Sequence, residues 1–214
     1  MTRLPAAALF DLDGVLIDTE GLYTEIWADI ERAHPTGIND FAHKIKGSTL
    51  QRILSTHFPA PAMQADIVAM LKEREDAMVY ELFAGVADFL ADLQRHHIPA
   101  AIVTSSNAPK MERLFGSLDG FRDFFAAVIT DGDVTHSKPH PECYLTAARR
   151  LGADIADCVV FEDSFSGLEA GRAAGAHVVA LATTNSRESL LGKADLIIDS
   201  FAGLGIEELA EKLG

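Results

Sequence analysis

Two aspartates one residue apart, Asp11 and Asp13, follow a short apolar run and stand directly before Gly14. A run that ends in this way is typical of a buried strand whose last residues leave the sheet. In an extended chain, residues two apart point to the same face, so both carboxylates would enter one small volume. Two anions that close repel each other unless a cation or a shared proton relieves them. These residues alone predict either such a site or an ordinary solvated Asp-x-Asp-Gly turn.

Further polar residues lie at the ends of other predicted strands. Ser105 follows the strand 98–104, and Glu162 and Asp163 follow the strand 158–161, while Lys138 lies in the loop before a helix. In an open parallel sheet, ligands bind beyond the carboxyl ends of the strands. Each residue also has an ordinary explanation, because Ser105 and the Glu162-Asp163 pair could cap helices and Lys138 could be a loop lysine. These separate explanations account poorly for the joint placement, which favours one shared site.

The chemistry that suits this set is phosphoryl transfer. Asp11 would be a carboxylate nucleophile, and the aspartyl-phosphate formed on it would split one hard displacement into two easier ones. Asp13 would protonate the departing oxygen and then take a proton from the attacking water. Ser105 and Lys138 would hold the phosphoryl oxygens, and Lys138 would also offset charge in the transition state.

A divalent cation would relieve the repulsion between the carboxylates. Asp11, Asp163 and a backbone carbonyl near Asp13 supply the hard oxygen ligands that Mg²⁺ prefers, and Glu162 could bind the ion directly or stand one layer behind it. We therefore expect Mg²⁺ as the cofactor.

The elements that must position these residues fall into two groups. Short apolar strands alternate with helices over most of the chain, which predicts a Rossmann-like, doubly wound parallel sheet covered on both faces. The strands are expected at 6–10, 98–104, 125–130, 158–161, 177–182 and 196–198, and helices at 86–96, 109–115, up to 151, up to 174 and at 206–213.

Residues 18–81 contain helical patterns and no convincing strand, with helices expected at about 20–34, 49–57 and 63–82. We therefore expect an α/β core of residues 1–17 and 82–214, interrupted by an all-helical cap of residues 18–81. The hinges should lie near residues 16–18 and 82–85, where the chain crosses between the two parts.

The composition is that of a globular protein, with 214 residues, 48% hydrophobic and 23% charged. A net charge of −14 argues against a nucleic-acid or anionic-membrane partner. No apolar run approaches the roughly 20 residues that span a bilayer, and the N-terminus lacks the features of a secretory signal. Two cysteines, Cys143 and Cys158, make no disulfide framework. A cytoplasmic protein, expected as a monomer, is the simplest interpretation.

Four segments resemble the four motifs of the haloacid dehalogenase superfamily, in the right order, and the resemblance covers essentially the whole chain. They are Asp11-Leu12-Asp13-Gly14-Val15, Thr104-Ser105-Ser106, Ser137-Lys138-Pro139 and Glu162-Asp163-Ser164. The resemblance is to the phosphatase and phosphomutase branch with a helical cap after the first motif. In that superfamily the dehalogenases lack the second aspartate, so Asp13 implies phosphate chemistry.

Within that branch, the sequence is similar to small sugar-phosphate phosphatases and to β-phosphoglucomutase. The mutase has a histidine in the first cap helix and an arginine in the cap loop, whereas this chain has Tyr23 at the first position and no arginine at the second. Arg52 lies one turn into the next helix, where a solvated role is expected. These departures favour a phosphatase, although Lys46, Lys72 or Arg74 could still hold a second phosphate.

Substrate choice would come from residues that face the site from the cap or from the core helix. The candidates are Glu20, Tyr23, Lys46, Asn107 and Lys110. A cap that carries Glu20 suggests recognition of hydroxyl groups, which fits a small phosphorylated metabolite such as a sugar or polyol phosphate.

A non-enzymatic alternative is a phospho-receiver domain, which also combines a doubly wound sheet with a phosphorylated aspartate and Mg²⁺ ligands. Two features argue against it. The phosphorylated aspartate of a receiver normally follows an interior strand of the sequence and not the first, and receivers lack a long helical insert after that first strand. A family member that binds a metabolite without turnover has no support, because each catalytic position is filled.

Overall fold

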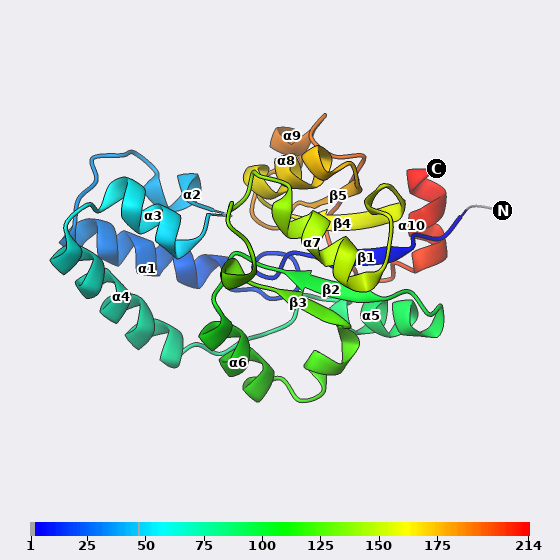
Figure 1. The fold of residues 1–214 in the computed structure, drawn as a ribbon, viewed down its shortest axis with the longest axis horizontal. Coiled ribbons are helices and arrows are strands. Elements are labelled where there is room, and N and C mark those ends of the chain that lie inside the picture. Colours follow the sequence, from blue (N-terminus) through cyan, green and yellow to red (C-terminus); the bar gives the residue numbers. More distant parts are fainter. Residues whose placement is uncertain (1–2, 47) are drawn as a thin grey trace.

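The structure, a computed structural model, describes residues 3–46 and 48–214 and is built around one parallel sheet (Figure 1). Across these residues the sheet has six strands in the order β3-β2-β1-β4-β5-β6, and all neighbouring strands are parallel. The strands are β1 (Ala7–Phe10), β2 (Ala100–Val103), β3 (Ala127–Ile129), β4 (Cys158–Glu162), β5 (His177–Leu181) and β6 (Leu196–Ile198). The predicted doubly wound parallel sheet is confirmed.

Helices cover both faces of this sheet. Successive residues of β1 alternate between two buried clusters, since Ala8 and Phe10 join one and Ala7 and Leu9 the other. The first cluster includes residues of α5 (Val86–Arg95), α6 (Ala108–Ser117) and α10 (Ile206–Leu213). The second includes residues of α7 (Glu142–Leu151), α8 (Phe165–Ala174) and α9 (Arg187–Leu190). Three short 3-10 helices occupy Phe121–Phe124, Asp131–Asp133 and Ile155–Asp157.

An aromatic cluster supports the strand ends where the predicted catalytic residues begin. Phe10 stacks on Phe161 with the ring centroids 4.6 Å apart, and Phe89 and Phe201 pack against both rings. All four rings are almost fully buried. Because Phe10 precedes Asp11 and Phe161 precedes Glu162, this packing holds the ends of β1 and β4 in fixed register.

The insert between β1 and β2 forms a helical layer with its own hydrophobic core (Figure 1). Its helices are α1 (Glu20–Ala33), α2 (Phe41–Lys44), α3 (Leu50–His57) and α4 (Pro61–Asp76). Buried residues from each of the four pack together, among them Trp27, Phe41, Ile53 and Ile67. The four-residue helix α2 was not predicted, because one turn is too short to show a hydrophobic period.

Two crossing segments join this cap to the core. Ile17 pairs with Leu82 in an antiparallel bridge, and the amide of Asp18 donates to the carbonyl of Glu81 at 3.0 Å. These hydrogen bonds also correct one prediction, because α4 ends at Asp76 and does not continue to Leu82. Glu81 and Leu82 lie outside the helix, and their backbone pairs with the segment that enters the cap.

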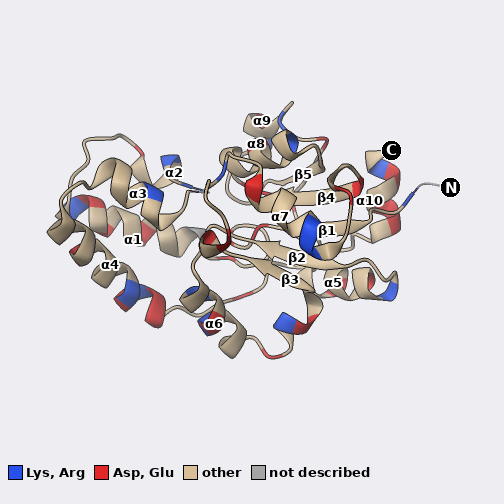
Figure 2. Cartoon of the chain, viewed as in Figure 1, with Lys and Arg blue, Asp and Glu red and all other residues tan. Residues whose placement is uncertain are grey.

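Charged residues of both signs are spread over the outer helices, including the end of α4 that faces α6 (Figure 2). None of the helices in the described residues combines the length and the apolar character that crossing a bilayer requires.

Candidate active site

Asp11 lies directly after β1, the strand at which the order of the sheet reverses, and its carboxylate is paired with Lys138. The Nζ atom of Lys138 lies 2.6 Å from Oδ1 of Asp11 and 2.6 Å from Oε1 of Glu162. The lysine side chain is 2% exposed and that of Glu162 fully buried, so each charge requires the other for its burial to be tolerable. One ammonium therefore bridges two carboxylates from the ends of β1 and β4.

Burial disfavours the charged form of both residues, so it raises the pKa of Asp11 and acts to lower the pKa of Lys138. Burial raises the pKa of Asp11 to about 7, with Lys138 opposing the shift and the neighbouring carboxylates adding to it. The two carboxylates keep the pKa of Lys138 above its ordinary value although burial works against them. The lysine is therefore a permanent cation, whereas the charge of Asp11 responds to pH near neutrality.

Glu162 has both of its oxygens saturated by donors. Oε1 accepts from Lys138 and from the hydroxyl of Tyr144 at 2.7 Å, while Oε2 accepts from the amides of Asp163 and Ser164 and from the Ser164 hydroxyl. A Cβ at Gly167 would collide with this carboxylate, so only glycine fits there. Of the two positions expected for Glu162, these contacts favour the one behind the metal, where it fixes Lys138.

The carboxylates at this end of the sheet suit a divalent cation. Ligand oxygens of Asp11, Glu162 and Asp163 lie within 4.8 Å of one another. Gly14, with φ of +80°, allows the Asp163 carboxylate to lie against its Cα, where any Cβ would collide with it. Hard carboxylate oxygens in a buried, negatively charged pocket are the donor set that Mg²⁺ prefers. Asp11 and Asp163 are the residues whose donor atoms would hold it.

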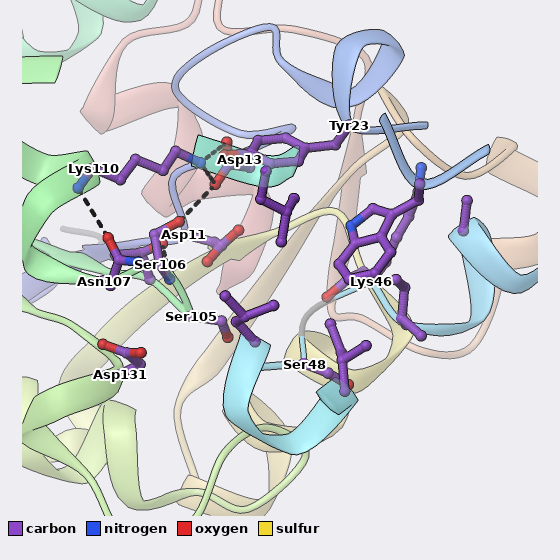
Figure 3. A pocket seen from close by; sticks show the side chains of 18 of the residues that line it. Asp11, Asp13, Tyr23, Lys46, Ser48, Ser105, Ser106, Asn107, Lys110 and Asp131 are labelled. Atoms are coloured by element: carbon purple, nitrogen blue, oxygen red, sulfur yellow. Dashed lines mark hydrogen bonds and ion pairs between the residues drawn. The ribbon is translucent and has the colours of Figure 1, made fainter. Parts of the chain in front are cut away.

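Asp13 pairs with a second lysine, Lys110 (Figure 3). The Nζ atom of Lys110 lies 2.6 Å from each Asp13 oxygen, and the Lys110 side chain is 3% exposed. The Ser106 hydroxyl donates to Oδ2 at 3.1 Å, and the Thr19 hydroxyl also donates to this carboxylate. Each of the two adjacent aspartates is thus held by a different buried lysine.

A cavity of about 140 Å³ lies between the cap and the carboxyl ends of the strands. From the core, its lining includes Asp11, Asp13, Ser105, Ser106, Asn107, Lys110 and Asp163. From the cap, it includes Tyr23, Thr24, Trp27, Lys46, Ser48 and Glu75. The paired aspartates therefore face a space that both parts of the chain enclose.

The chain matches the family of haloacid dehalogenase-like hydrolases over residues 5–175. The protein is a haloacid dehalogenase-like hydrolase. It is 32% identical to hexitol phosphatase A of Escherichia coli over 90% of this chain and 89% of that protein. It is 27% identical to a bifunctional riboflavin kinase/FMN phosphatase of Arabidopsis thaliana over 97% of this chain, but it spans only 56% of that longer protein.

The fold is shared with β-phosphoglucomutase of Clostridium difficile, with a TM-score of 0.81 and 23% identity over 98% of this chain and 97% of that one. The family membership removes the receiver-domain alternative. It also explains why a helical insert separates β1 from β2 in the hydrolase, since that insert belongs to the branch that the four motifs resemble.

The predicted cap residues of the hydrolase have different surroundings. Tyr23 lines the cavity, but its hydroxyl donates to Glu75 at 2.8 Å. Lys46 lines the cavity, and its backbone carbonyl accepts from Ser166 of the core. The side chain of Glu20 lies outside the described part of the structure.

Asn107 lines the cavity while its side chain caps α6, accepting from the Lys110 amide at 2.9 Å. Arg52 is exposed on α3, as expected, but it also makes contacts that the sequence does not predict. Its guanidinium reaches from the cap to the core, donating to the Lys138 carbonyl at 3.0 Å and to the Ser137 hydroxyl. These contacts were not predicted, because helical spacing does not reveal which loop folds against α3.

The residues around Asp13 are those that the sequence did not assign. Lys110 was expected to face the substrate, whereas its ammonium contacts Asp13. Ser106 follows Ser105 in one of the four motifs and Thr19 lies at the entry to the cap, and the sequence predicts no role for either. In the sequence, Lys110 is only a lysine three residues after the N-cap Asn107. Neither its burial nor its partner, 97 positions away, can be predicted from that position.

Proposed function

We propose that this hydrolase is a Mg²⁺-dependent phosphatase that acts on small phosphorylated metabolites, sugar or polyol phosphates among them, through phosphorylation of Asp11. The observation that carries the proposal is the bridge from Lys138 to Asp11 and Glu162 at 2.6 Å each, beside Asp163 and beneath a cavity. Phosphoryl transfer needs a nucleophile, a cation and an electrostatic clamp in one place.

The reaction follows from these positions in two steps. An Asp11 oxygen forms a bond to phosphorus, the ester bond to the leaving oxygen breaks, and Asp13 gives that oxygen a proton. Water then attacks phosphorus, Asp13 takes its proton, and the bond to Asp11 breaks to release inorganic phosphate. Ser105 and Lys138 would hold the phosphoryl oxygens during both steps.

When bound, Mg²⁺ would neutralise the negative charge that Asp11, Asp163 and the phosphoryl group bring together. The chain's own part is to keep these groups dry and fixed: Lys138 cannot move without unpairing Glu162, and the cap covers the site on the side of the leaving group.

A phosphomutase would need a grip on a second phosphate. Among the described residues that line the cavity, the cap contributes one cation, Lys46. Lys72 and Arg74 do not line the cavity and instead pair with Asp76 and Asp29 on the surface. This supports hydrolysis over transfer to a second sugar position.

A panel of phosphorylated sugars and polyols, scored for released phosphate with Mg²⁺, tests the proposal. Hydrolysis of at least one of them over many turnovers supports it, and no release from any ester opposes it. β-Glucose 1-phosphate with the bisphosphate separates the two reactions, since a mutase gives glucose 6-phosphate and a phosphatase gives free phosphate.

Chelation of the metal should silence the enzyme, and Mg²⁺ should restore it. The apparent affinity for Mg²⁺ should also fall as the pH drops below about 7. The pKa of Asp11, which burial raises to about 7, means that below this pH the metal must displace a proton from it, at about a tenfold cost in affinity per pH unit. Above pH 7 the affinity should level off.

Isothermal titration calorimetry between pH 5.5 and 8.5 measures this dependence. Asp11→Asn, which has no proton to displace, serves as the control and should bind Mg²⁺ more weakly with a flatter profile. An affinity in the unmodified enzyme that is constant over this range, or activity that survives excess chelator, would contradict the prediction.

A further inference from the structure

Lys110 is a buried cation for which the proposed reaction has no stated task. It lies on α6, it is 2% exposed, and its ammonium contacts both oxygens of Asp13 at 2.6 Å. An ammonium buried to this degree requires a partner of opposite charge. Thr19 contacts Oδ1 of Asp13 and Ser106 contacts Oδ2, whereas Lys110 contacts both oxygens and so restrains rotation of the carboxylate.

The cap covers the other side of this ammonium. The ring of Tyr23, on α1, lies with its centroid 4.4 Å from the Lys110 Nζ (Figure 3). An aromatic face at this distance attracts a cation and excludes water from it. A residue of the cap therefore covers one side of the Lys110 ammonium, although Lys110 and Asp13 both belong to the core.

The Tyr23 ring packs on the hydrophobic core of the cap, and its hydroxyl begins a second set of contacts that leads back to α6. Its hydroxyl donates to Oε1 of Glu75 on α4, and Oε2 of Glu75 accepts from the guanidinium of Arg113 at 2.6 Å. Arg113 follows Lys110 by three positions, so both lie on one face of α6. Charged residues of both signs gather where α4 approaches α6 (Figure 2). Two core residues on one helix thus engage two cap residues, and Asp13 is at the inner end of the chain of contacts.

We propose that Lys110 is a positioning residue for Asp13: it fixes the carboxylate for proton transfer to the leaving oxygen, and the ring of Tyr23 makes that position depend on the seating of the cap over α6. This rests on the proposed function, because it assigns a task within that reaction.

The experiment uses the basicity of the leaving oxygen as its readout. An alkoxide leaves only with a proton, whereas a nitrophenolate leaves without one, so loss of correctly placed Asp13 should slow alkyl esters far more than nitrophenyl esters. Benzyl phosphate and 4-nitrophenyl phosphate present rings of similar size and differ in this property. The value of kcat/KM reports the step in which the leaving group departs, before water attacks the phosphorylated Asp11.

Lys110→Met should lower kcat/KM for benzyl phosphate about 10- to 100-fold, since a carboxylate displaced by about 1 Å loses that much rate, and should change the nitrophenyl ester less than about threefold. The readout is therefore the ratio of kcat/KM for benzyl phosphate to kcat/KM for 4-nitrophenyl phosphate. Tyr23→Leu should lower this ratio, as Lys110→Met does. Tyr23→Phe keeps the ring over the ammonium and loses only the hydroxyl, so it serves as the matched control and should leave the ratio within about twofold. Asp13→Ala sets the largest drop in the ratio that this readout can show.

If Lys110→Met leaves this ratio unchanged, whether or not both kcat/KM values fall, the inference is overturned, because a purely structural lysine would affect both substrates alike. If Lys110→Met does not fold, the comparison of Tyr23→Leu with Tyr23→Phe decides: a fall in the first alone supports the inference, and no fall in either overturns it. If the unmodified enzyme with Mg²⁺ hydrolyses neither ester, the proposed function has failed, and that outcome is distinct from these.

Discussion

Asp11→Asn is expected to abolish phosphate release, with a loss of about 10⁴-fold or more in kcat, as removal of a covalent nucleophile does in other enzymes. The amide has the same shape as the carboxylate but no nucleophilic oxygen, and it leaves Lys138 paired with Glu162 alone. Steady-state assays on a substrate that the unmodified enzyme hydrolyses would measure the loss. Mass spectrometry of acid-quenched protein should find a phosphorylated Asp11 in the unmodified enzyme and none in the variant.

The same substitution should not destabilise the metal-free fold above pH 7. Burial raises the pKa of Asp11 to about 7, so its ionised form is disfavoured in the folded state relative to the unfolded chain, in which the carboxyl ionises at its ordinary, lower pKa. The penalty grows as the pH rises from the unfolded value towards 7 and is fully present above it. The neutral asparagine avoids it, so at pH 8 without metal the thermal midpoint of the variant should equal or exceed that of the unmodified protein.

A variant that keeps near-normal turnover would exclude Asp11 as the nucleophile. Asp11→Ala controls for slow deamidation of the new asparagine, because alanine cannot regenerate the acid. A loss of activity counts as a loss of chemistry only if the variants are folded, and the thermal midpoint shows whether they are.

Lys138→Met is expected to damage both activity and stability. Methionine fills a similar volume without a charge, so it leaves the buried carboxylates of Asp11 and Glu162 without the cation that bridges them. Removing one partner of a buried ion pair costs about 3–5 kcal/mol of unfolding free energy. If Lys138 holds the phosphoryl oxygens as proposed, loss of its charge should lower kcat by about 10²- to 10³-fold.

Urea titration and steady-state kinetics would measure the two effects. Lys72→Met is the matched control: its side chain is 70% exposed and pairs with Asp76 on the surface, so its removal should cost less than about 1 kcal/mol and leave turnover unchanged. A Lys138→Met protein as stable as this control would contradict the bridging role.

Much of the fold could be predicted because its elements are local in origin. The strands are short apolar runs that end in polar residues, and the bounds of β6 and α10 agree with the expected 196–198 and 206–213. The helices end where glycine or proline punctuates the pattern, as at Gly175 after α8. The end of α4 is the exception. Beyond it the Glu81 carbonyl accepts from the Asp18 amide and the Phe83 amide donates to the Leu16 carbonyl, so the chain pairs with the segment entering the cap and does not continue the helix.

The candidate site divides in the same way. The sequence by itself determined which residues stand at the carboxyl ends of the strands, since a strand end is a local feature and parallel topology brings those ends together. The roles given to Asp11, Asp13, Ser105, Lys138 and Asp163 stay predictions. The structure places Asp11, Asp13, Ser105 and Asp163 on the lining of one cavity, and it pairs Lys138 with Asp11.

Only the tertiary structure decided how the charges pair. In the structure, Glu162 pairs with Lys138 and accepts hydrogen bonds from backbone amides. Asp13 pairs with Lys110, which lies 97 positions away, and helical spacing does not predict this partner. The physical reason is that a buried charge is satisfied by whichever partner the packing of helices brings within about 3 Å, and no local pattern encodes that choice. The paired aspartates at the end of β1 were evident from the chain, whereas the separate lysine that holds each of them was not.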